Sequence, residues 1–145
     1  MTKIVAVAGK GGVGKTSLAG AFVKVLVEKY PDKKILAIDA DPAVGLSTVL
    51  NIEVDKTIDD IRKEVIKNVA DELVMYEKAG VIVNRIPDKK VIELMDISGL
   101  PLLSVIENDM KLAEADIKGE NILTLSDDDR IVAGAAEALC NIGLI

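Results

Sequence analysis

The chain has 145 residues, the length of one domain, and a domain of this size buries roughly 68–70% of the surface of its unfolded chain. Its residues are 50% hydrophobic and 29% charged, a balance that excludes an intrinsically disordered chain. With aromatic residues at only 2%, the core must be aliphatic. A net charge of −6 excludes a general attraction to nucleic acid or to anionic lipid, so we expect neither a nucleic-acid nor a membrane partner.

The chain has one cysteine, Cys140, and no histidine. One thiol excludes an intrachain disulfide, and without histidine too few soft ligands remain for a zinc or nickel site within one chain. No apolar stretch reaches the roughly 18 residues that span a bilayer, and the first apolar run is too short for the core of a signal peptide. We therefore expect a soluble, unprocessed protein of the reducing cytoplasm.

The first third of the chain has the pattern strand, loop, helix, strand. Residues 3–8 form a short β-branched run, apolar residues recur at helical spacing over 18–30, and residues 34–38 form a second apolar run. Both runs are continuous rather than alternating, which is typical of strands buried on both faces of a parallel sheet. A βαβ unit is predicted.

The rest of the chain alternates in the same way. The predicted elements are a helix over 57–76, a strand over 80–84, a helix over 88–97, a strand over 101–106 and a short helix over 110–115. A last helix is predicted to begin with Ser126 as its N-cap and to end near Gly143. Its first turn would hold Asp127, Asp128 and Asp129. This order predicts one α/β domain over residues 1–145, with a mostly parallel sheet of about four strands and helices on both faces.

The segment Gly9–Thr16 satisfies the pattern G-x-x-x-x-G-K-[ST] directly after a predicted strand and at the start of a predicted helix. Glycines let the backbone turn its N–H groups around a phosphate, and the helix N-terminus adds positive potential. Lys15 is expected to reach the β- and γ-phosphates, and the Thr16 hydroxyl to ligate Mg²⁺. The residues expected to hold the phosphates are Gly11, Gly12, Val13, Gly14, Lys15, Thr16 and Ser17.

The same loop also spells G-x-G-x-x-G through Gly9, Gly11 and Gly14, and Asp39 stands where a Rossmann fold places its ribose-binding acid. A dinucleotide pyrophosphate has no need of a lysine and a hydroxyl directly after the third glycine. The P-loop, and with it a P-loop NTPase-like sheet, is therefore favoured, and an NAD-binding Rossmann protein stays the alternative.

The stretch Lys10–Thr16 resembles the deviant Walker A motif of the MinD/ParA/nitrogenase-iron-protein superfamily of dimeric ATPases. This resemblance implies ATP or ADP and Mg²⁺ as cofactors, with Lys10 reaching the nucleotide of the partner in a homodimer. By the same resemblance, Asp39 holds the water shell of Mg²⁺ and Asp41 orients the attacking water. Independently of the family, two carboxylates at the carboxyl end of a strand beside a P-loop are well placed for Mg²⁺.

The strand over 80–84 and the following Arg85 resemble the late strand of that family, whose asparagine reads the adenine edge. An amide offers one donor and one acceptor, which match the adenine amino group and its neighbouring ring nitrogen. Asn84 is therefore assigned to the base, and Arg85 is assigned to the same nucleotide site. An asparagine that only forms a turn is the alternative for Asn84.

Within the superfamily, residues 4–14 and 113–119 are most similar to CooC-type ATPases, which assist nickel insertion into carbon monoxide dehydrogenase. This similarity implies a metalloenzyme client of that kind. The chain lacks the Cys-x-Cys metal motif and the Walker B strand ending in Asp that such proteins carry, so we predict an internal deletion between Asn68 and Ala79. Hydrolysis should then be weak, and exposed sheet edges invite pairing with a second chain or domain swapping.

Three hypotheses of function follow. The first is an adenine-nucleotide-binding, CooC-like ATPase. The second is a non-catalytic remnant or engineered minimal version of the fold that serves as a scaffold or partner-binding module. The third is the NAD-binding Rossmann protein.

Overall fold

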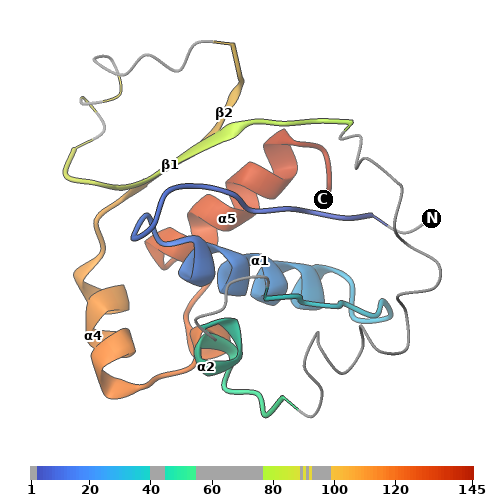
Figure 1. Ribbon diagram of the computed structural model, residues 1–145, viewed down its shortest axis with the longest axis vertical. Helices are drawn as coiled ribbons and strands as arrows, with labels where there is room; N and C mark the ends of the chain where they lie inside the picture. Colours follow the sequence, from blue (N-terminus) through green and yellow to red (C-terminus); the bar gives the residue numbers. More distant parts are fainter. Residues whose placement is uncertain (1–2, 40–44, 55–76, 89, 91, 93–98) are drawn as a thin grey trace.

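The computed structural model describes residues 3–39, 45–54, 77–88, 90, 92 and 99–145, and Figure 1 shows their arrangement. The described elements are, in chain order, α1 (Lys15–Lys29), α2 (Leu46–Leu50), β1 (Val81–Ile86), β2 (Leu102–Glu107), α4 (Met110–Lys118), the 3₁₀ turn η2 (Ile122–Thr124) and α5 (Arg130–Asn141). No helix among these residues is long and apolar enough to cross a bilayer.

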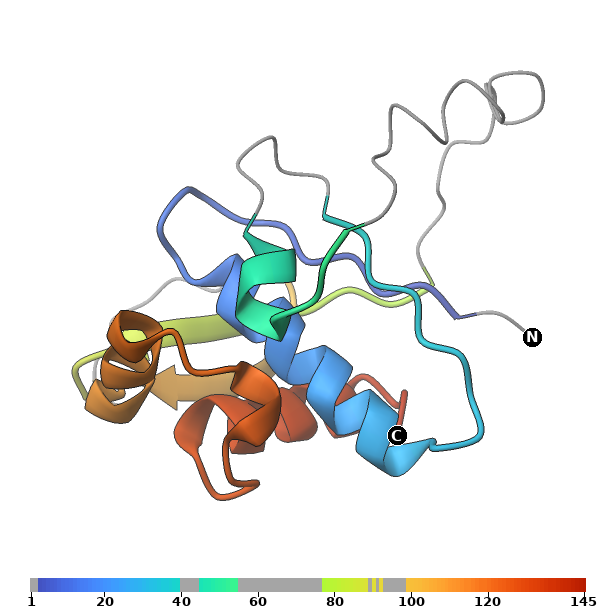
Figure 2. The same ribbon diagram turned by 90° about the horizontal axis from the view of Figure 1, so that it is seen from below.

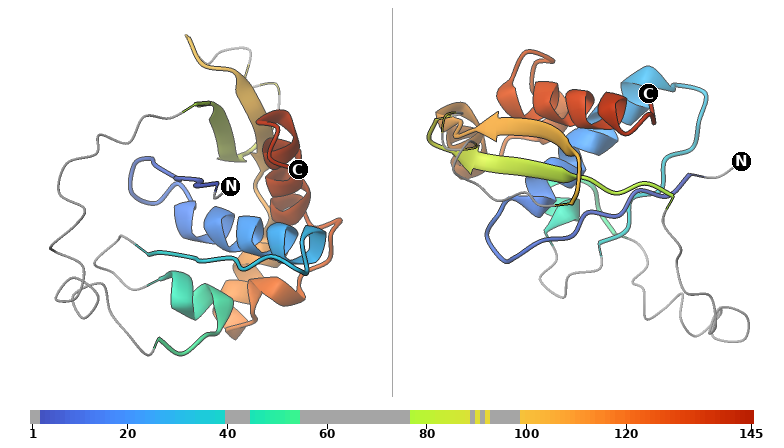
Figure 3. Two further views of the ribbon diagram at one scale, coloured as in Figure 1. Left: turned by 90° about the vertical axis from the view of Figure 1, so that its right-hand side faces the viewer. Right: turned by 90° about the horizontal axis from the view of Figure 1, so that it is seen from above.

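Strands β1 and β2 lie side by side as a parallel sheet, and helices flank it (Figure 3). The pairing joins Val81 to Leu102 and Asn84 to Ile106, with register shifts near both ends of β1. The predicted α/β class with a parallel sheet is confirmed. Because the strands are parallel, their carboxyl ends meet at one edge of the sheet.

The core is aliphatic apart from Phe22, and it forms where α1 packs against α5 and α5 packs against β2. Ala21 of α1 and Ala135 of α5 are fully buried, and Ile131 and Leu139 are 1% exposed. A Cβ atom on Gly134 would lie 2.4 Å from Cγ1 of Ile106, so glycine is required where α5 approaches β2 most closely. This packing fixes α1 relative to the sheet.

Helix α2 and the turn η2 pack on another side of α1 (Figure 2). A Cβ atom on Gly20 would lie 2.9 Å from Cγ1 of Val49 and 3.0 Å from Cγ2 of Ile122, so this contact also depends on a glycine in α1. Asn121 joins the two segments, because its side-chain amide donates to the carbonyl oxygen of Leu50 at 2.8 Å and its oxygen accepts from the N–H of Leu123. Neither α2 nor η2 was predicted from the sequence.

Two predicted strands are not strands in the structure. Residues 3–8 and 34–38 have no regular secondary structure, and the described residues form a sheet of two strands rather than about four. Ile4 and Leu36 are 82% and 83% exposed. An apolar β-branched run becomes a strand only where a neighbour completes its hydrogen-bond ladder, and no described segment pairs with either run.

The helix boundaries differ from prediction at two places. The helix predicted over 110–115 is confirmed and extends to Lys118. The last helix begins at Arg130 with Asp129 as its N-cap, so Ser126 is not the cap and the three aspartates precede the helix. Ser126 instead donates its N–H to the carboxylate of Asp129 at 2.8 Å. The helix predicted over 57–76, most of that over 88–97 and most of the predicted deletion near 68–79 lie outside the described residues.

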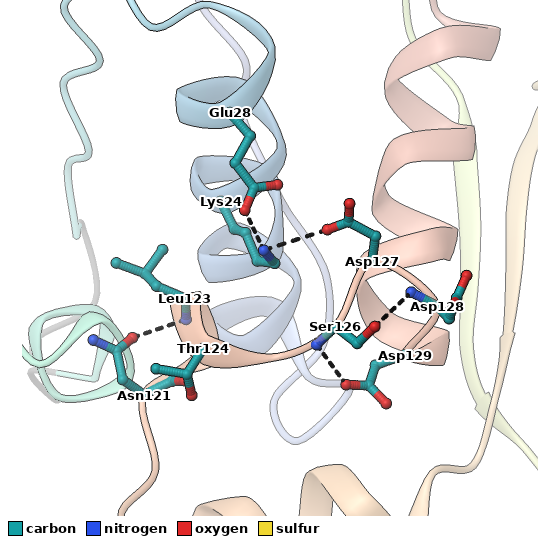
Figure 4. Close-up of polar contacts among 9 residues, drawn as sticks. All are labelled: Lys24, Glu28, Asn121, Leu123, Thr124, Ser126, Asp127, Asp128 and Asp129. Atoms are coloured by element: carbon teal, nitrogen blue, oxygen red, sulfur yellow. Dashed lines mark hydrogen bonds and ion pairs between the residues drawn. The ribbon is translucent and has the colours of Figure 1, made fainter.

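Asp127 takes part in an ion-pair cluster rather than in helix capping (Figure 4). Lys24 of α1 is 5% exposed, donates to Glu28 one turn later, and has its Nζ 3.4 Å from Oδ1 of Asp127. The hydrogen bond to Glu28 raises the pKa of Lys24 above its ordinary value of 10.5, burial opposes this, and both carboxylates add to the rise. The cluster links α1 to the loop before α5.

We expect Lys24→Met to change how stability depends on pH. Because the folded-state pKa of Lys24 is raised, its contribution is complete below pH 10.5 and is lost as the pH rises through the raised pKa. While Glu28 and Asp127 stay ionised, the difference in unfolding free energy between wild type and Lys24→Met, measured in urea, should be constant below pH 10.5, and it should move against the wild type above that pH. A difference that does not change above pH 10.5 would contradict this.

Candidate functional site

The loop 9–14 leads directly into the N-terminus of α1 (Figure 1). Gly12 and Gly14 have φ of 80° and 85°, a left-handed conformation that glycine adopts without strain. Gly14 is the N-cap of α1 and has no side chain to accept the first helical N–H groups. Those amides therefore point from a helix of 15 residues toward the loop, an arrangement that favours an anion.

Three cationic side chains lie at this loop. Lys10 is exposed, and Lys15 donates to the carbonyl oxygen of Lys10 at 3.3 Å. Arg85 reaches the loop from β1, donating to the carbonyl oxygen of Gly12 at 3.4 Å. The positive potential of the helix terminus is thus reinforced by side chains, as a phosphate group requires. Of the other predicted phosphate ligands, Thr16 is half-buried and Ser17 is 6% exposed.

The end of β1 contacts the same loop, which brings together residues about 70 positions apart. Asn84 donates its side-chain amide to the carbonyl oxygen of Val13 at 3.0 Å. A Cβ atom on Gly14 would lie 2.6 Å from Nδ2 of Asn84, so the loop and the strand touch. The structure therefore places the predicted cofactor-binding residues Asn84 and Arg85 beside the predicted phosphate-binding loop.

A cavity of about 310 Å³ opens at the carboxyl ends of both strands. Its lining residues are Asn84, Arg85, Ile106, Glu107, Asn108, Asp109, Leu112, Ala113, Ile117 and Ile131. In open parallel sheets, ligands bind in the crevice outside the carboxyl ends of the strands. The cavity has that position, and it shares Asn84 and Arg85 with the loop.

Arg130 contacts two residues that line this cavity, and the sequence did not predict this role. It donates to the carbonyl oxygen of Asn108 at 2.8 Å and lies 3.6 Å from Oε2 of Glu107. The first helical residue of α5 thereby holds the loop that follows β2. No local motif marks this arginine, because its partners lie 22 and 23 residues earlier in the chain.

Asp39 lies at the start of α2. Its Oδ2 accepts the N–H groups of Gly45 at 3.0 Å and of Leu46 at 2.9 Å. The sequence predicted a Mg²⁺ role for this carboxylate and did not predict the capping role. Asp41 lies outside the described residues.

Comparison with known proteins assigns the family. Residues 4–122 match the CobQ/CobB/MinD/ParA nucleotide binding domain, and the chain belongs to this family. The MinD/ParA superfamily predicted from Lys10–Thr16 is thereby confirmed. No solved structure matches the chain.

Curated relatives match over shorter stretches. An uncharacterized ATP-binding protein of Methanocaldococcus jannaschii is 48% identical over 64 residues, 44% of this chain and 24% of its own length. A protein of Aquifex aeolicus named as an arsenical pump-driving ATPase is 51% identical over 45 residues, 31% of this chain and 14% of its own. A homologue of the ATPase ASNA1 in Entamoeba histolytica is 41% identical over 51 residues, 35% of this chain and 16% of its own. The matches thus span a quarter or less of these relatives.

We expect Asp39→Ala to lower the free energy of unfolding by about 0.5–2 kcal/mol, because two N–H groups at the start of α2 lose their acceptor. Asp39→Asn keeps an oxygen acceptor and should retain most of the stability. Urea unfolding measures both.

Asp88 provides the matched control, since its carboxylate accepts the N–H of Lys90 in an exposed turn. Asp88→Ala should leave stability nearly unchanged. Equal stability of Asp39→Ala and wild type would show that the capping contacts contribute nothing.

Proposed function

We propose that the protein binds ATP or ADP with Mg²⁺, with the phosphates on the loop 9–14 and the first turn of α1 and the base in the cavity at the ends of β1 and β2. The observation that carries the proposal is the glycine loop at a helix N-terminus that no side chain caps. Family membership and the relatives named as ATP-binding protein and as ATPases support it.

The chain offers suitable groups for each part of the nucleotide. In the proposed complex Lys15 leaves the carbonyl oxygen of Lys10 and binds the β- and γ-phosphates. The Thr16 hydroxyl and, through water, the Asp39 carboxylate supply oxygen ligands of the kind that Mg²⁺ prefers. Bound Mg²⁺ would neutralise charge on the phosphates.

The base is proposed to be adenine. Asn84 has a second N–H and a carbonyl oxygen beyond the N–H that it donates to Val13, and these match the donor and acceptor of the adenine edge. The cavity beside it, with apolar walls from Ile106, Leu112 and Ile131, is large enough for a purine ring.

Hydrolysis is proposed to be weak, because the sequence has no Walker B strand ending in Asp. The catalytic groups proposed are Lys10, Lys15 and Asp41. Lys10 would reach the nucleotide of the partner across a homodimer. The proposal includes a homodimer that forms by domain swapping. The exposed position of Lys10 supports the first of these roles.

The biological role is proposed to be that of a cytoplasmic, CooC-like accessory protein with a metalloenzyme client of the carbon monoxide dehydrogenase type. The similarity of residues 4–14 and 113–119 supports this branch of the family. The absence of Cys-x-Cys from the sequence means that such a protein would not carry nickel by that motif.

Lys15→Ala should raise the dissociation constant for ADP at least about tenfold, because a charge-assisted contact to the phosphates is lost. Isothermal titration calorimetry with Mg²⁺ measures it. Lys29→Ala, at the opposite end of α1, is the matched control and should bind like wild type. Unchanged affinity in Lys15→Ala, or a preference for NADH over ATP, would overturn the P-loop assignment.

Phosphate release separates the enzyme from a non-catalytic binding module. If the protein is an ATPase, release above background should disappear in Lys10→Ala and in Asp41→Ala while ADP affinity persists. Intact binding with no turnover in wild type would identify the module instead.

A further inference from the structure

The residues at the end of β1 line the cavity, and they also form hydrogen bonds to the phosphate loop. Nδ2 of Asn84 donates to the carbonyl oxygen of Val13 at 3.0 Å, and Nη1 of Arg85 donates to that of Gly12 at 3.4 Å. Two consecutive residues of a strand thus bind two consecutive carbonyls of the loop.

A regular strand cannot make this contact, because its successive side chains point to opposite faces. Arg85 has φ of 61°, in the left-handed region that a non-glycine residue rarely adopts. The pairing of β1 with β2 is also irregular between Asn84 and Ile86. This local departure from the strand turns both side chains toward the loop.

The side chains of Asn84 and Arg85 lie directly against Gly14 of the loop. A Cβ atom on Gly14 would lie 2.6 Å from Nδ2 of Asn84 and 3.2 Å from Nε of Arg85. Gly14 is needed for its φ of 85°, and a larger residue there would also push the Asn84 amide away from the loop.

A hydrogen bond to a carbonyl of the loop also fixes the direction of the N–H group that follows it in the chain. In a planar trans peptide the C=O and the following N–H point in opposite directions. A hydrogen bond from Asn84 to the Val13 carbonyl thus directs the N–H of Gly14 away from β1, and the Arg85 bond does the same for the N–H of Val13. These are two of the amides assigned to the phosphates.

We propose that Asn84 and Arg85 are positioning residues of the phosphate loop, which hold its carbonyls so that its amides are preorganised for a phosphate. This inference rests on the proposed nucleotide site and adds a role to Asn84 beyond reading the base. Pyrophosphate, which has no base, then becomes the probe that separates the two roles.

The first test needs no nucleotide. In ¹⁵N relaxation measurements, the order parameters of the Val13 and Gly14 amides should fall in Asn84→Ala from about 0.85, typical of rigid backbone, toward the flexible range below about 0.6. Asn141→Ala is the matched control, because Asn141 donates the same kind of bond to the Leu103 carbonyl at 2.7 Å, away from the loop. Unchanged order parameters in Asn84→Ala would overturn the proposal even if the protein binds no nucleotide.

The second test is calorimetry with pyrophosphate and with ADP. Loss of one hydrogen bond should weaken pyrophosphate about fivefold in Asn84→Ala and leave it unchanged in Asn141→Ala. Weaker ADP binding with unchanged pyrophosphate affinity would mean that Asn84 serves only the base, and the proposal would fall. Arg85 is exposed, so the order parameter of the Val13 amide in Arg85→Ala tests the proposal if Asn84→Ala does not fold. That order parameter should fall, and an unchanged value would overturn the role of Arg85, whereas pyrophosphate affinity would also report the lost charge.

Discussion

The structure depends on the packing of α1 against three neighbours. Ala21 and Phe22 lie in the core that α5 completes, while Gly20 allows Val49 of α2 and Ile122 of η2 to approach the helix backbone. The buried Lys24 binds carboxylates on its own helix and in the loop before α5. Because a helix held on several sides cannot shift along its axis, its N-terminus is a fixed point, and the glycine loop 9–14 is built there.

The second fixed point is the carboxyl end of β1, and the candidate site lies between the two. Helix α5 packs on β2, which pairs with β1, so the same core that holds α1 also sets the distance from α1 to the strand. The loop spans this distance and is bonded to the strand through Asn84 and Arg85. The distance and orientation between the loop amides and the neighbouring cavity are therefore fixed. A ligand that has a charged end and a flat end requires such a fixed arrangement.

Sequence reasoning predicted those elements whose signal is local. The glycine loop and α1 follow from spacing alone, and β1, β2 and the helix beginning at Met110 lie within a few residues of their predicted bounds. The predictions were wrong where an element depends on a contact with another part of the chain. Residues 3–8 and 34–38 have the composition of strands and lack a paired neighbour among the described residues, and Ser126 has the chemistry of an N-cap and lies four residues before the helix begins.

The site divides in the same way between sequence and structure. The sequence by itself determined the family and the glycine loop at the start of α1, because the spacing of Gly12, Gly14 and Lys15 is local. Only the tertiary structure decided that Asn84 and Arg85 bind the loop, that Arg130 holds the rim of the cavity and that Asp39 caps α2. Three of these contacts join residues 22 or more positions apart, and the fourth joins Asp39 to the start of an unpredicted helix. No spacing rule encodes them, since their geometry exists only once α1, the sheet and α5 have packed together.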